Sequence, residues 1–389
     1  MKKILFVIYS LEGGGAEKSL VNLLNEIPEK KYSIDLLLFK KTGIFLEQVP
    51  KHVRVLETPK ALTKLYGPLA KGGIYSFFKI ITTLLSRIFE NKEENYSPFR
   101  WKYFYTKIVK KLNREYDVAI AYLSGDPMFY VGDKVKAKKK IYWVHNDYLS
   151  DKHPKKYEYK YFKESSAIVT VSQVCLEILN KVFPEFKEKS FYLENITSDK
   201  IIRKKAVEFY PEEYKINKEI RLLTIGRLTY QKGLDLGIEA AKILKEWKLE
   251  FTWFILGTGE EKDKIVELIK KYKLEKEVIL LGIKENPYPY IRNCDIFIQP
   301  SRYEGKSVVL DEAKILAKPI VVTNYPTVKD QIINDKEGHI VNLDSISIAK
   351  GIREVMEDKN LYNKIENYLK NNNYGNEKEI SKYIKIFDK

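Results

Sequence analysis

Cysteine and long apolar runs are both scarce in this chain of 389 residues. Its two cysteines, Cys175 and Cys294, are too few for a disulfide framework. No apolar run approaches the ~18 residues of a membrane-spanning helix, and the N-terminal run Ile4–Ile8 is too short for the core of a signal peptide. We therefore expect a globular, cytoplasmic protein in a reducing compartment.

Metal-binding motifs are missing as well. The sequence contains no Asp-x-Asp pair, and its four histidines form no ligand cluster: His52, His145, His153 and His339. Protein metal sites are commonly built from such carboxylate pairs or histidine clusters. We expect no metal ion and no other cofactor.

Positive charge is in excess and unevenly distributed. Residues 1–196 carry 34 Lys and Arg against 22 Asp and Glu, whereas the rest of the chain carries 35 against 31. Residues 60–114 alone carry 12 basic and 3 acidic side chains. Within them, Ile74–Phe89 and Pro98–Lys111 combine basic with apolar and aromatic residues.

Two interpretations of the basic segment 60–111 stay open. Basic residues interleaved with Phe, Trp and Tyr suit a surface that lies on anionic lipid headgroups. Equally, two amphipathic helices would pack on the domain core and keep their lysines in solvent. Nucleic acid ranks last, because the other motifs offer nothing to a bound polyanion, and we expect no nucleic-acid partner.

Strand-like and helix-like segments alternate, which is typical of parallel sheets covered by helices on both faces. In the first half, strands are predicted at Ile4–Tyr9, Ile34–Phe39, Val53–Leu56, Asp117–Leu123, Lys140–Val144, Ala167–Val171 and Phe191–Leu193, with a helix at Gly15–Glu26. In the second half, strands are predicted at Arg221–Ile225, Thr252–Leu256, Val278–Leu281, Asp295–Gln299 and Ile320–Thr323, with helices at Leu234–Trp247, Glu260–Tyr272 and Ser345–Glu357. The polar segment 197–218 breaks the pattern and is predicted to be an interdomain linker.

The segment 299–323 joins the end of a predicted strand, a polar loop and a predicted helix, Val308–Leu316. Ser307 is a candidate N-cap, and the N–H groups of the first helical turn suit an anion such as a diphosphate. Glu304 and Glu312 flank this helix start, where carboxylates would accept hydrogen bonds from sugar hydroxyls. Taken alone, such a pair is more often an ordinary set of solvated charges.

Three further groups follow predicted strands, where ligands bind in sheets of this kind. Arg227 and Lys232 flank a turn and would together neutralise a diphosphate. Gly13–Gly15 let the backbone approach a ligand, but they lack the GxGxxG spacing, which disfavours a dehydrogenase. His145 directly follows the strand Lys140–Val144, although an isolated histidine is more often structural.

Three motifs together resemble those of the family 4 retaining glycosyltransferases, which belong to glycosyltransferase group 1. Glu304-Gly305 and Glu312-Ala313 match the EG(x)6EA signature. The stretch IGRLTYQKGLD, Ile225–Asp235, resembles the family's second signature, and SLEGGGAEKSLVNL, Ser10–Leu23, resembles its glycine-rich first loop. The motifs occur in the family's order and span almost the whole chain.

The resemblance implies the GT-B fold, in which two Rossmann-like domains with doubly wound parallel sheets face a central cleft. It implies an acceptor-side domain over residues 1–196 and a donor-binding domain over residues 219–373. A C-terminal helix, within residues 374–389, would pack back on the first domain. The resemblance also implies retention of anomeric configuration, with neither a metal ion nor a covalent nucleophile.

The resemblance assigns roles in sugar transfer to particular residues. Glu304 would bind the donor sugar, and Glu312 would bind the ribose. Arg227 and Lys232 would bind the diphosphate, to which Ser307 and Val308 would donate hydrogen bonds from their amides. In the first domain, Gly14 and Gly15 would shape the diphosphate and acceptor sites, and His145 would support the reacting face of the sugar. At Lys306 and Ser307 the chain departs from many members, which have an apolar residue and Gly or Pro. Lys306 would add a cation to the phosphate site or point into solvent.

The sequence therefore predicts a retaining hexosyltransferase that uses a nucleoside-diphosphate sugar, with a UDP-sugar favoured. Its acceptor would be a glycan or lipid-linked glycan in cell-surface polysaccharide synthesis. Segment 60–111 would hold the protein peripherally on the inner face of the cell membrane. Two alternatives stay open. One is a nucleotide-sugar epimerase-like enzyme on the same fold, and the other is a non-catalytic, membrane-associated scaffold.

Overall fold

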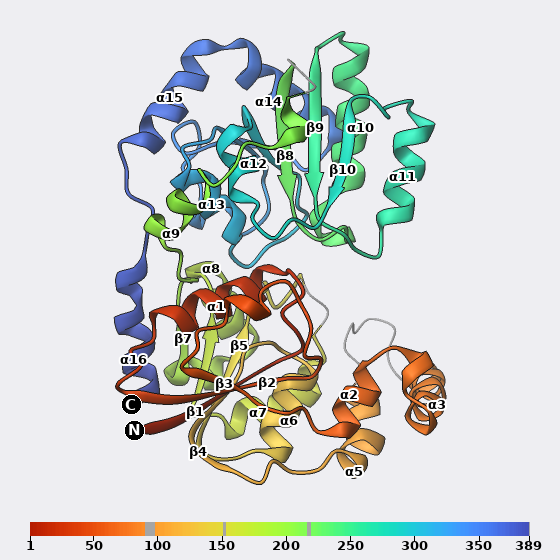
Figure 1. Cartoon of the computed structure of the whole chain (residues 1–389), viewed down its shortest axis with the longest axis vertical. Coiled ribbons are helices and arrows are strands. Elements are labelled where there is room, and N and C mark those ends of the chain that lie inside the picture. Colours follow the sequence, from red (N-terminus) through yellow and green to blue (C-terminus); the bar gives the residue numbers. More distant parts are fainter. Residues whose placement is uncertain (90–97, 151–152, 216–218, 389) are drawn as a thin grey trace. The chain divides into compact units, whose positions relative to one another are not determined.

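The computed structural model describes residues 1–89, 98–150, 153–215 and 219–388, which form two compact units (Figure 1). The first unit comprises Met1–Asn195 and Lys378–Lys389, and the second comprises Ile196–Glu377. Parts of the predicted basic segment, of the predicted linker and of the C-terminal helix, at 90–97, 216–218 and 389, lie outside the described residues.

Seven parallel strands form the sheet of the first unit, in the order β3-β2-β1-β4-β5-β6-β7. Their bounds are β1 (Lys2–Ile8), β2 (Tyr32–Leu38), β3 (Val53–Val55), β4 (Glu115–Ala121), β5 (Lys136–Val144), β6 (Ala167–Thr170) and β7 (Ser190–Tyr192). Several are apolar almost throughout, because strands of a parallel sheet are buried on both faces. The strand order changes direction between β1 and β4, so the loops after these strands lie where open α/β sheets bind ligands.

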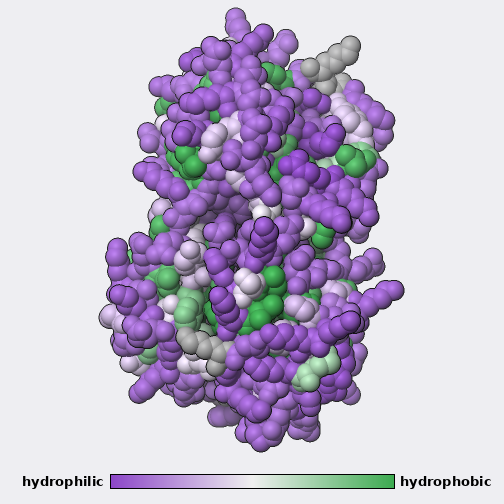
Figure 2. Space-filling view, turned by 90° about the vertical axis from the view of Figure 1, so that its left-hand side faces the viewer, coloured by the Kyte–Doolittle hydropathy of each residue, from purple (hydrophilic) through white to green (hydrophobic). Residues whose placement is uncertain are grey.

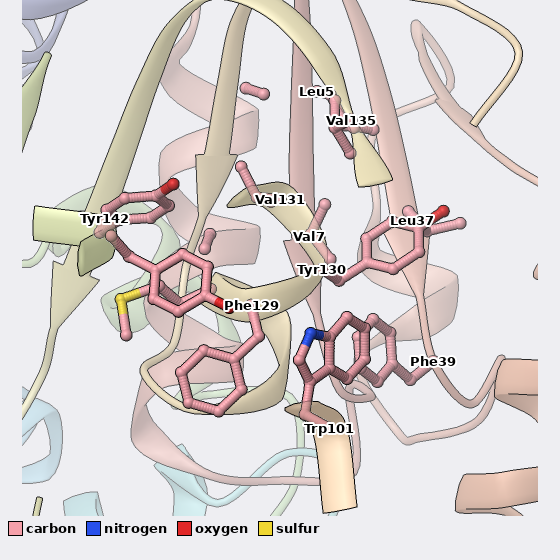
Figure 3. Close-up of a cluster of buried hydrophobic side chains, with 14 of the residues drawn as sticks. Leu5, Val7, Leu37, Phe39, Trp101, Phe129, Tyr130, Val131, Val135 and Tyr142 are labelled. Atoms are coloured by element: carbon pink, nitrogen blue, oxygen red, sulfur yellow. The ribbon is translucent and has the colours of Figure 1, made fainter. Parts of the chain in front are cut away.

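Helices cover the first sheet and extend beyond its edge. They are α1 (Gly15–Glu26), α2 (Lys60–Tyr66), α3 (Ile74–Phe89), α4 (Pro98–Arg100), α5 (Thr106–Ile108), α6 (Asp126–Lys134), α7 (Lys155–Glu164), α8 (Gln173–Val182) and α16 (Ile380–Asp388), with a π-turn at Trp101–Tyr105 between α4 and α5. Figure 3 shows part of the core, where Phe129 and Tyr130 of α6 meet Trp101 and side chains from β1 and β2.

Helix α16 returns to the first unit after the chain has completed the second. Phe387 presents its ring edge-on to Phe6 of β1 and Tyr32 of β2, with centroid distances of 6.1 and 6.2 Å. Asp388 binds Lys31, Lys2 and the Tyr32 hydroxyl, and the hydrogen bond from Lys31 is the main reason that the pKa of Asp388 falls to about 2. The first unit is thus built from two stretches of chain that are far apart in sequence.

Six parallel strands form the sheet of the second unit, in the order β10-β9-β8-β11-β12-β13. The strands are β8 (Ile220–Ile225), β9 (Phe251–Leu256), β10 (Val278–Gly282), β11 (Ile296–Gln299), β12 (Ile320–Thr323) and β13 (His339–Val341). The helices are α9 (Asp199–Lys205), α10 (Leu234–Glu246), α11 (Lys262–Lys271), α12 (Tyr288–Asn293), α13 (Val308–Ile315), α14 (Ser345–Glu357) and α15 (Lys359–Lys370). The predicted class, two doubly wound parallel α/β domains, is confirmed.

Besides α9, which lies in the predicted linker, the elements β13, α12 and α15 are absent from the predicted set. Strand β13 has only three residues and begins with a histidine. Helix α12 follows Pro287 and contains Pro289 in its first turn, a pattern that also marks loops. Helix α15 exposes most of its length and buries only Ile365 and Leu369.

Most of the segment expected to be a linker belongs to the second unit. It contains α9, and Ile202, Ala206 and Tyr214 are buried in a core that also includes Phe254. A few apolar side chains are enough to attach this polar stretch to the second unit, because they pack into its hydrophobic core.

Candidate functional site

Three loops of the second unit meet beyond the carboxyl ends of the adjacent strands β9, β8 and β11. The Leu228 N–H donates to the Thr258 carbonyl at 3.0 Å, and the Arg302 N–H donates to the Gln231 carbonyl at 2.7 Å. Gly257 has φ +140°, and a Cβ there would lie 1.9 Å from the Gly226 carbonyl oxygen. Glycine is therefore required for the loops after β8 and β9 to approach this closely.

The loops after β8 and β11 are joined in the same way. Gly233 has φ +60°, and a Cβ there would lie 2.0 Å from the Pro300 carbonyl oxygen. Arg302 binds Asp235 through two hydrogen bonds of 2.8 and 3.0 Å and covers the ring of Tyr230 at 4.1 Å. Burial alone would raise the pKa of Asp235, but the hydrogen bond and charge of Arg302 outweigh burial and lower that pKa.

The predicted residues Glu304 and Lys232 meet in this loop cluster. Glu304 is only 6% exposed. Its Oε1 accepts hydrogen bonds from Lys232 Nζ at 2.5 Å and from Ser301 Oγ at 2.7 Å, and its Oε2 lies 3.4 Å from Gln231 Nε2. A buried carboxylate needs a compensating charge, and Lys232 supplies it as the ion-pair partner of Glu304. The sequence assigned these two residues to different parts of a donor, yet the structure pairs them.

Arg227 lies in the turn directly after β8, as predicted, and is exposed. Its guanidinium takes part in none of the ion pairs between described residues. A planar, permanently charged fork at the carboxyl edge of the sheet is suited to bidentate contact with phosphate oxygens.

Helix α13 begins next to this cluster, and Ser307 occupies its N-cap position as predicted, but the Ser307 side chain makes no capping hydrogen bond. Its Oγ donates to Gln299 Oε1 at 2.8 Å, and its N–H donates to Gln331 Oε1 at 3.0 Å. Gln331 therefore competes with an anion for one of the predicted amides, a contact across 24 residues that no local pattern reveals. Val308 is the first helical residue and is buried, whereas Lys306 is half-buried.

Glu312 lies in the second turn of α13 and has no exposed surface. Its Oε1 accepts from the Tyr288 hydroxyl of α12 at 3.5 Å. The prediction that it binds a ribose needs a ligand to reach beneath the start of the helix, and the structure places Glu312 deeper than Glu304.

The remaining predicted residues, Gly14, Gly15 and His145, belong to the first unit. Gly14 caps α1 after β1, and Gly15 is the first, exposed residue of that helix. His145 follows β5 and lies 4.8 Å from the Tyr122 ring, between centroids. Burial lowers the pKa of His145 to about 4, so its imidazole is neutral at pH 7.

Sequence reasoning missed four residues that shape the loop cluster: Gln231, Asp235, Ser301 and Arg302. Gln231 and Asp235 lie within the stretch quoted for the second signature, and Ser301 and Arg302 lie just before Glu304. Their side chains act by tying the loops together, and only the pairing of β8 with β11 brings them into contact.

The described residues contain neither a group of metal ligands nor a membrane-spanning helix. Across 1–89, 98–150, 153–215 and 219–388, no three His, Cys, Asp or Glu side chains are grouped as a metal site requires. In the same residues, none of the helices combines the length and apolarity needed to cross a membrane.

Residues 207–372 match the family model of glycosyl transferases group 1. N-acetylgalactosamine-N,N'-diacetylbacillosaminyl-diphospho-undecaprenol 4-alpha-N-acetylgalactosaminyltransferase of Campylobacter jejuni is 28% identical over 383 residues, covering 95% of this chain and 94% of the relative. An uncharacterized glycosyltransferase of Methanocaldococcus jannaschii is 29% identical over 204 residues, so the match spans half of each chain. Other relatives are glycosyltransferases of amylovoran and O-antigen biosynthesis.

Solved structures show the same fold at low sequence identity. Anabaena HepE, crystallised with UDP-glucose, superposes with a TM-score of 0.72 and 16% identity, covering 99% of this chain and 98% of that chain. The chain therefore has the GT-B fold. Residues 207–372, which contain the loop cluster, are thus similar to glycosyl transferases group 1, and the Campylobacter jejuni relative, which matches over nearly its full length, is a glycosyltransferase as well.

Proposed function

We propose that this protein is a retaining hexosyltransferase of family 4 that takes a sugar from a nucleoside diphosphate, with UDP favoured. The observation that carries the proposal is the Glu304–Lys232 pair at the carboxyl edge of the second sheet, held at 2.5 Å among loops that are fixed to one another. The HepE structure with UDP-glucose supports the choice of donor.

The roles proposed for the second unit follow from charge and position. Arg227 and the amides at the start of α13 would bind the diphosphate, and Lys232 would add its charge as the leaving group departs. Glu304 would accept hydrogen bonds from hydroxyls of the donor sugar, and Glu312 from the ribose. Arg227 and Lys232 follow β8, in a loop that is hydrogen-bonded to the loop leading into α13, so these groups would stabilise the leaving charge without a metal ion.

The first unit would supply the acceptor side. A neutral His145 can accept or donate one hydrogen bond at the donor sugar without repelling an oxocarbenium-like charge. Gly14 and Gly15 would allow close approach of substrate to the start of α1. We infer that the acceptor is a glycan or lipid-linked glycan handled on the cytoplasmic side of a membrane, which the diphospho-undecaprenol substrate in the Campylobacter relative's name supports.

The experiment is slow donor hydrolysis by the purified protein across UDP-, GDP- and ADP-sugars, with EDTA present. One donor should be turned over, and Glu304→Ala should abolish that turnover while Glu357→Ala, an exposed glutamate on α14, leaves it unchanged. Identifying the released sugar's initial anomeric form by NMR tests retention. Conversion to another sugar nucleotide would instead favour the epimerase-like alternative.

Silence across the donor panel would be followed by one further assay. Undecaprenyl-diphosphate-linked sugars in detergent would be added as acceptors, since some transferases need the acceptor for turnover. Absence of donor binding by calorimetry as well as of transfer would favour a non-catalytic scaffold and contradict the proposal.

A further inference from the structure

Helix α3 (Ile74–Phe89) exposes several large apolar side chains. Six of them are between 37% and 71% exposed: Ile74, Phe77, Phe78, Ile80, Ile81 and Leu84. On the face of the molecule drawn in Figure 2, by contrast, the surface is mostly hydrophilic and hydrophobic side chains lie in small separate groups. Scattered apolar residues of that kind are normal, whereas six on one short helix mark an interaction surface.

The inward side of α3 combines the aromatic Tyr75, which packs against the core of the first unit, with small hydroxyl side chains. Thr82 has no exposed surface, and Ser86 is 4% exposed. Thr82 Oγ1 donates to the Phe78 carbonyl at 2.8 Å, and Ser86 Oγ donates to the Thr83 carbonyl at 2.9 Å. Apart from Tyr75, α3 thus turns small hydroxyl side chains toward its own unit while the six larger apolar side chains stay exposed, unlike an ordinary amphipathic helix in a soluble protein.

The two halves of the basic segment behave differently. After α3, the π-turn buries Trp101 and Tyr105 in the core of the first unit, and Trp101 Nε1 donates to Asp133 Oδ2 at 2.9 Å. Packing on the domain core therefore describes residues 98–108, whereas α3 contributes the partly buried Tyr75 and keeps six apolar side chains exposed. Figure 1 places α3 beside α2 at the margin of the first unit.

The two stretches that contain and follow α3 carry charge of positive sign only. Residues 58–89 and 98–114 contain no Asp or Glu at all. Burial lowers the pKa of Lys79, and the positive charges of Lys40 and Arg100 lower it further. Lys64 of α2 and Lys102 of the π-turn are exposed. Such a cluster favours an anionic partner.

We propose that α3 is an interfacial helix that inserts its apolar face into an anionic lipid bilayer while the surrounding basic residues bind the headgroups. Its 16 residues are too few to span a bilayer, which needs ~20, so the helix would lie in the plane of the surface. A second copy of the chain is a poorer partner, because a two-fold contact would bring the same positive cluster against itself. The inference rests on the membrane-side function proposed above.

The test is sedimentation of the full chain with vesicles of phosphatidylglycerol and phosphatidylcholine, compared with phosphatidylcholine alone. The protein should sediment with the anionic vesicles, less at high salt, and only weakly with the neutral ones. Phe77→Ser/Ile80→Ser/Leu84→Ser should weaken binding about tenfold or more. These side chains are 64%, 47% and 54% exposed, so their loss leaves the core intact.

A matched control removes equally exposed apolar residues from the second unit. Ile201→Ser/Val207→Ser/Ile346→Ser changes side chains that are 42%, 60% and 55% exposed, and binding to anionic vesicles should stay at the wild-type level. If both triple variants bind as wild type does, or if the wild-type chain does not bind, the proposal is wrong.

A second measurement reports directly how deeply α3 inserts into the bilayer. Phe77→Trp should show a blue-shifted emission with anionic vesicles and quenching by brominated acyl chains, whereas Ile346→Trp should show neither. Sedimentation velocity tests whether a second copy of the chain covers α3 instead. If the wild type forms dimers and the α3 triple variant does not, the proposal is wrong. Donor hydrolysis needs no membrane, so the protein should still hydrolyse the donor if only the docking inference is wrong. Conversely, it should still bind vesicles if only the proposed sugar transfer is wrong.

Discussion

The loop cluster of the second unit and the basic segment of the first unit use positive charge in opposite ways. Around the second sheet, Lys232 pairs with Glu304 and Arg302 pairs with Asp235, all four side chains being at most 18% exposed. Residues 58–89 and 98–114 of the first unit offer their lysines no acidic residue within those stretches. Paired, buried charges fix a geometry, whereas exposed charges of one sign attract a partner.

The largest expected effect comes from breaking the pair at the loop cluster. Lys232→Met removes a cation from the proposed diphosphate site and leaves the Glu304 carboxylate buried without its partner, so donor turnover should fall about a hundredfold or more. Initial rates of donor hydrolysis measure this. Lys364→Met, an exposed lysine on α15, is the control.

The double variant Lys232→Met/Glu304→Gln sharpens that prediction. Lys232→Met should also lower the free energy of unfolding, because it leaves a carboxylate buried without its partner. The double variant should recover that stability, because no buried charge stays unpaired, but it should not recover donor turnover. Recovery of turnover would mean that the pair only supports the loops, and the proposed roles would be wrong.

A somewhat smaller effect is expected for the neighbouring pair. Arg302→Ala removes two hydrogen bonds to Asp235 and should lower the free energy of unfolding by about 2 kcal/mol. Urea unfolding measures it. Lys242→Ala breaks a surface pair with Glu246 whose side chains are 45% and 58% exposed, and should cost less than about 0.5 kcal/mol. Equal losses in the two variants would contradict the contrast between buried and exposed pairs.

His145 extends the comparison to a buried group that is kept neutral instead of paired. Its folded pKa of about 4 lies below the unfolded value of 6.5, so the unfolded chain takes up a proton first as the pH falls. Stability should therefore be lost between about pH 6.5 and 4, by up to about 1.4 kcal/mol per pH unit from this residue. Urea unfolding at several pH values should show a shallower slope in His145→Gln, whereas identical slopes would contradict the assignment.

The smallest effect is expected on the exposed face of α3. The Phe77→Ser/Ile80→Ser/Leu84→Ser variant should change the free energy of unfolding by no more than about 0.5 kcal/mol per substitution without lipid, since the side chains contribute little to the core. Urea unfolding compares it with wild type. A much larger loss would mean that the apolar face is covered in solution.

Periodicity and strand propensity located most of the sheet strands, because near-continuous apolar runs such as Ile320–Thr323 allow few other buried structures. The same patterns placed Arg227 and Glu304 after strands. They did not reveal that Lys232 would bind Glu304, 72 residues away, or that Gln331 would occupy the Ser307 amide. Both contacts depend on which strands are neighbours. Helix α3 is amphipathic by its sequence, but only the structure shows which face is outside.

The position of α16 has a consequence for biosynthesis. During translation the first 195 residues emerge before the second unit, yet the surface formed by Phe6 and Tyr32 is covered only when Phe387 has been made. The first unit therefore waits for its closing helix while the second is synthesised and folds as a unit of its own. A fusion or truncation placed near Asp388 would accordingly disturb the unit whose sequence begins the chain, not the one that immediately precedes the change.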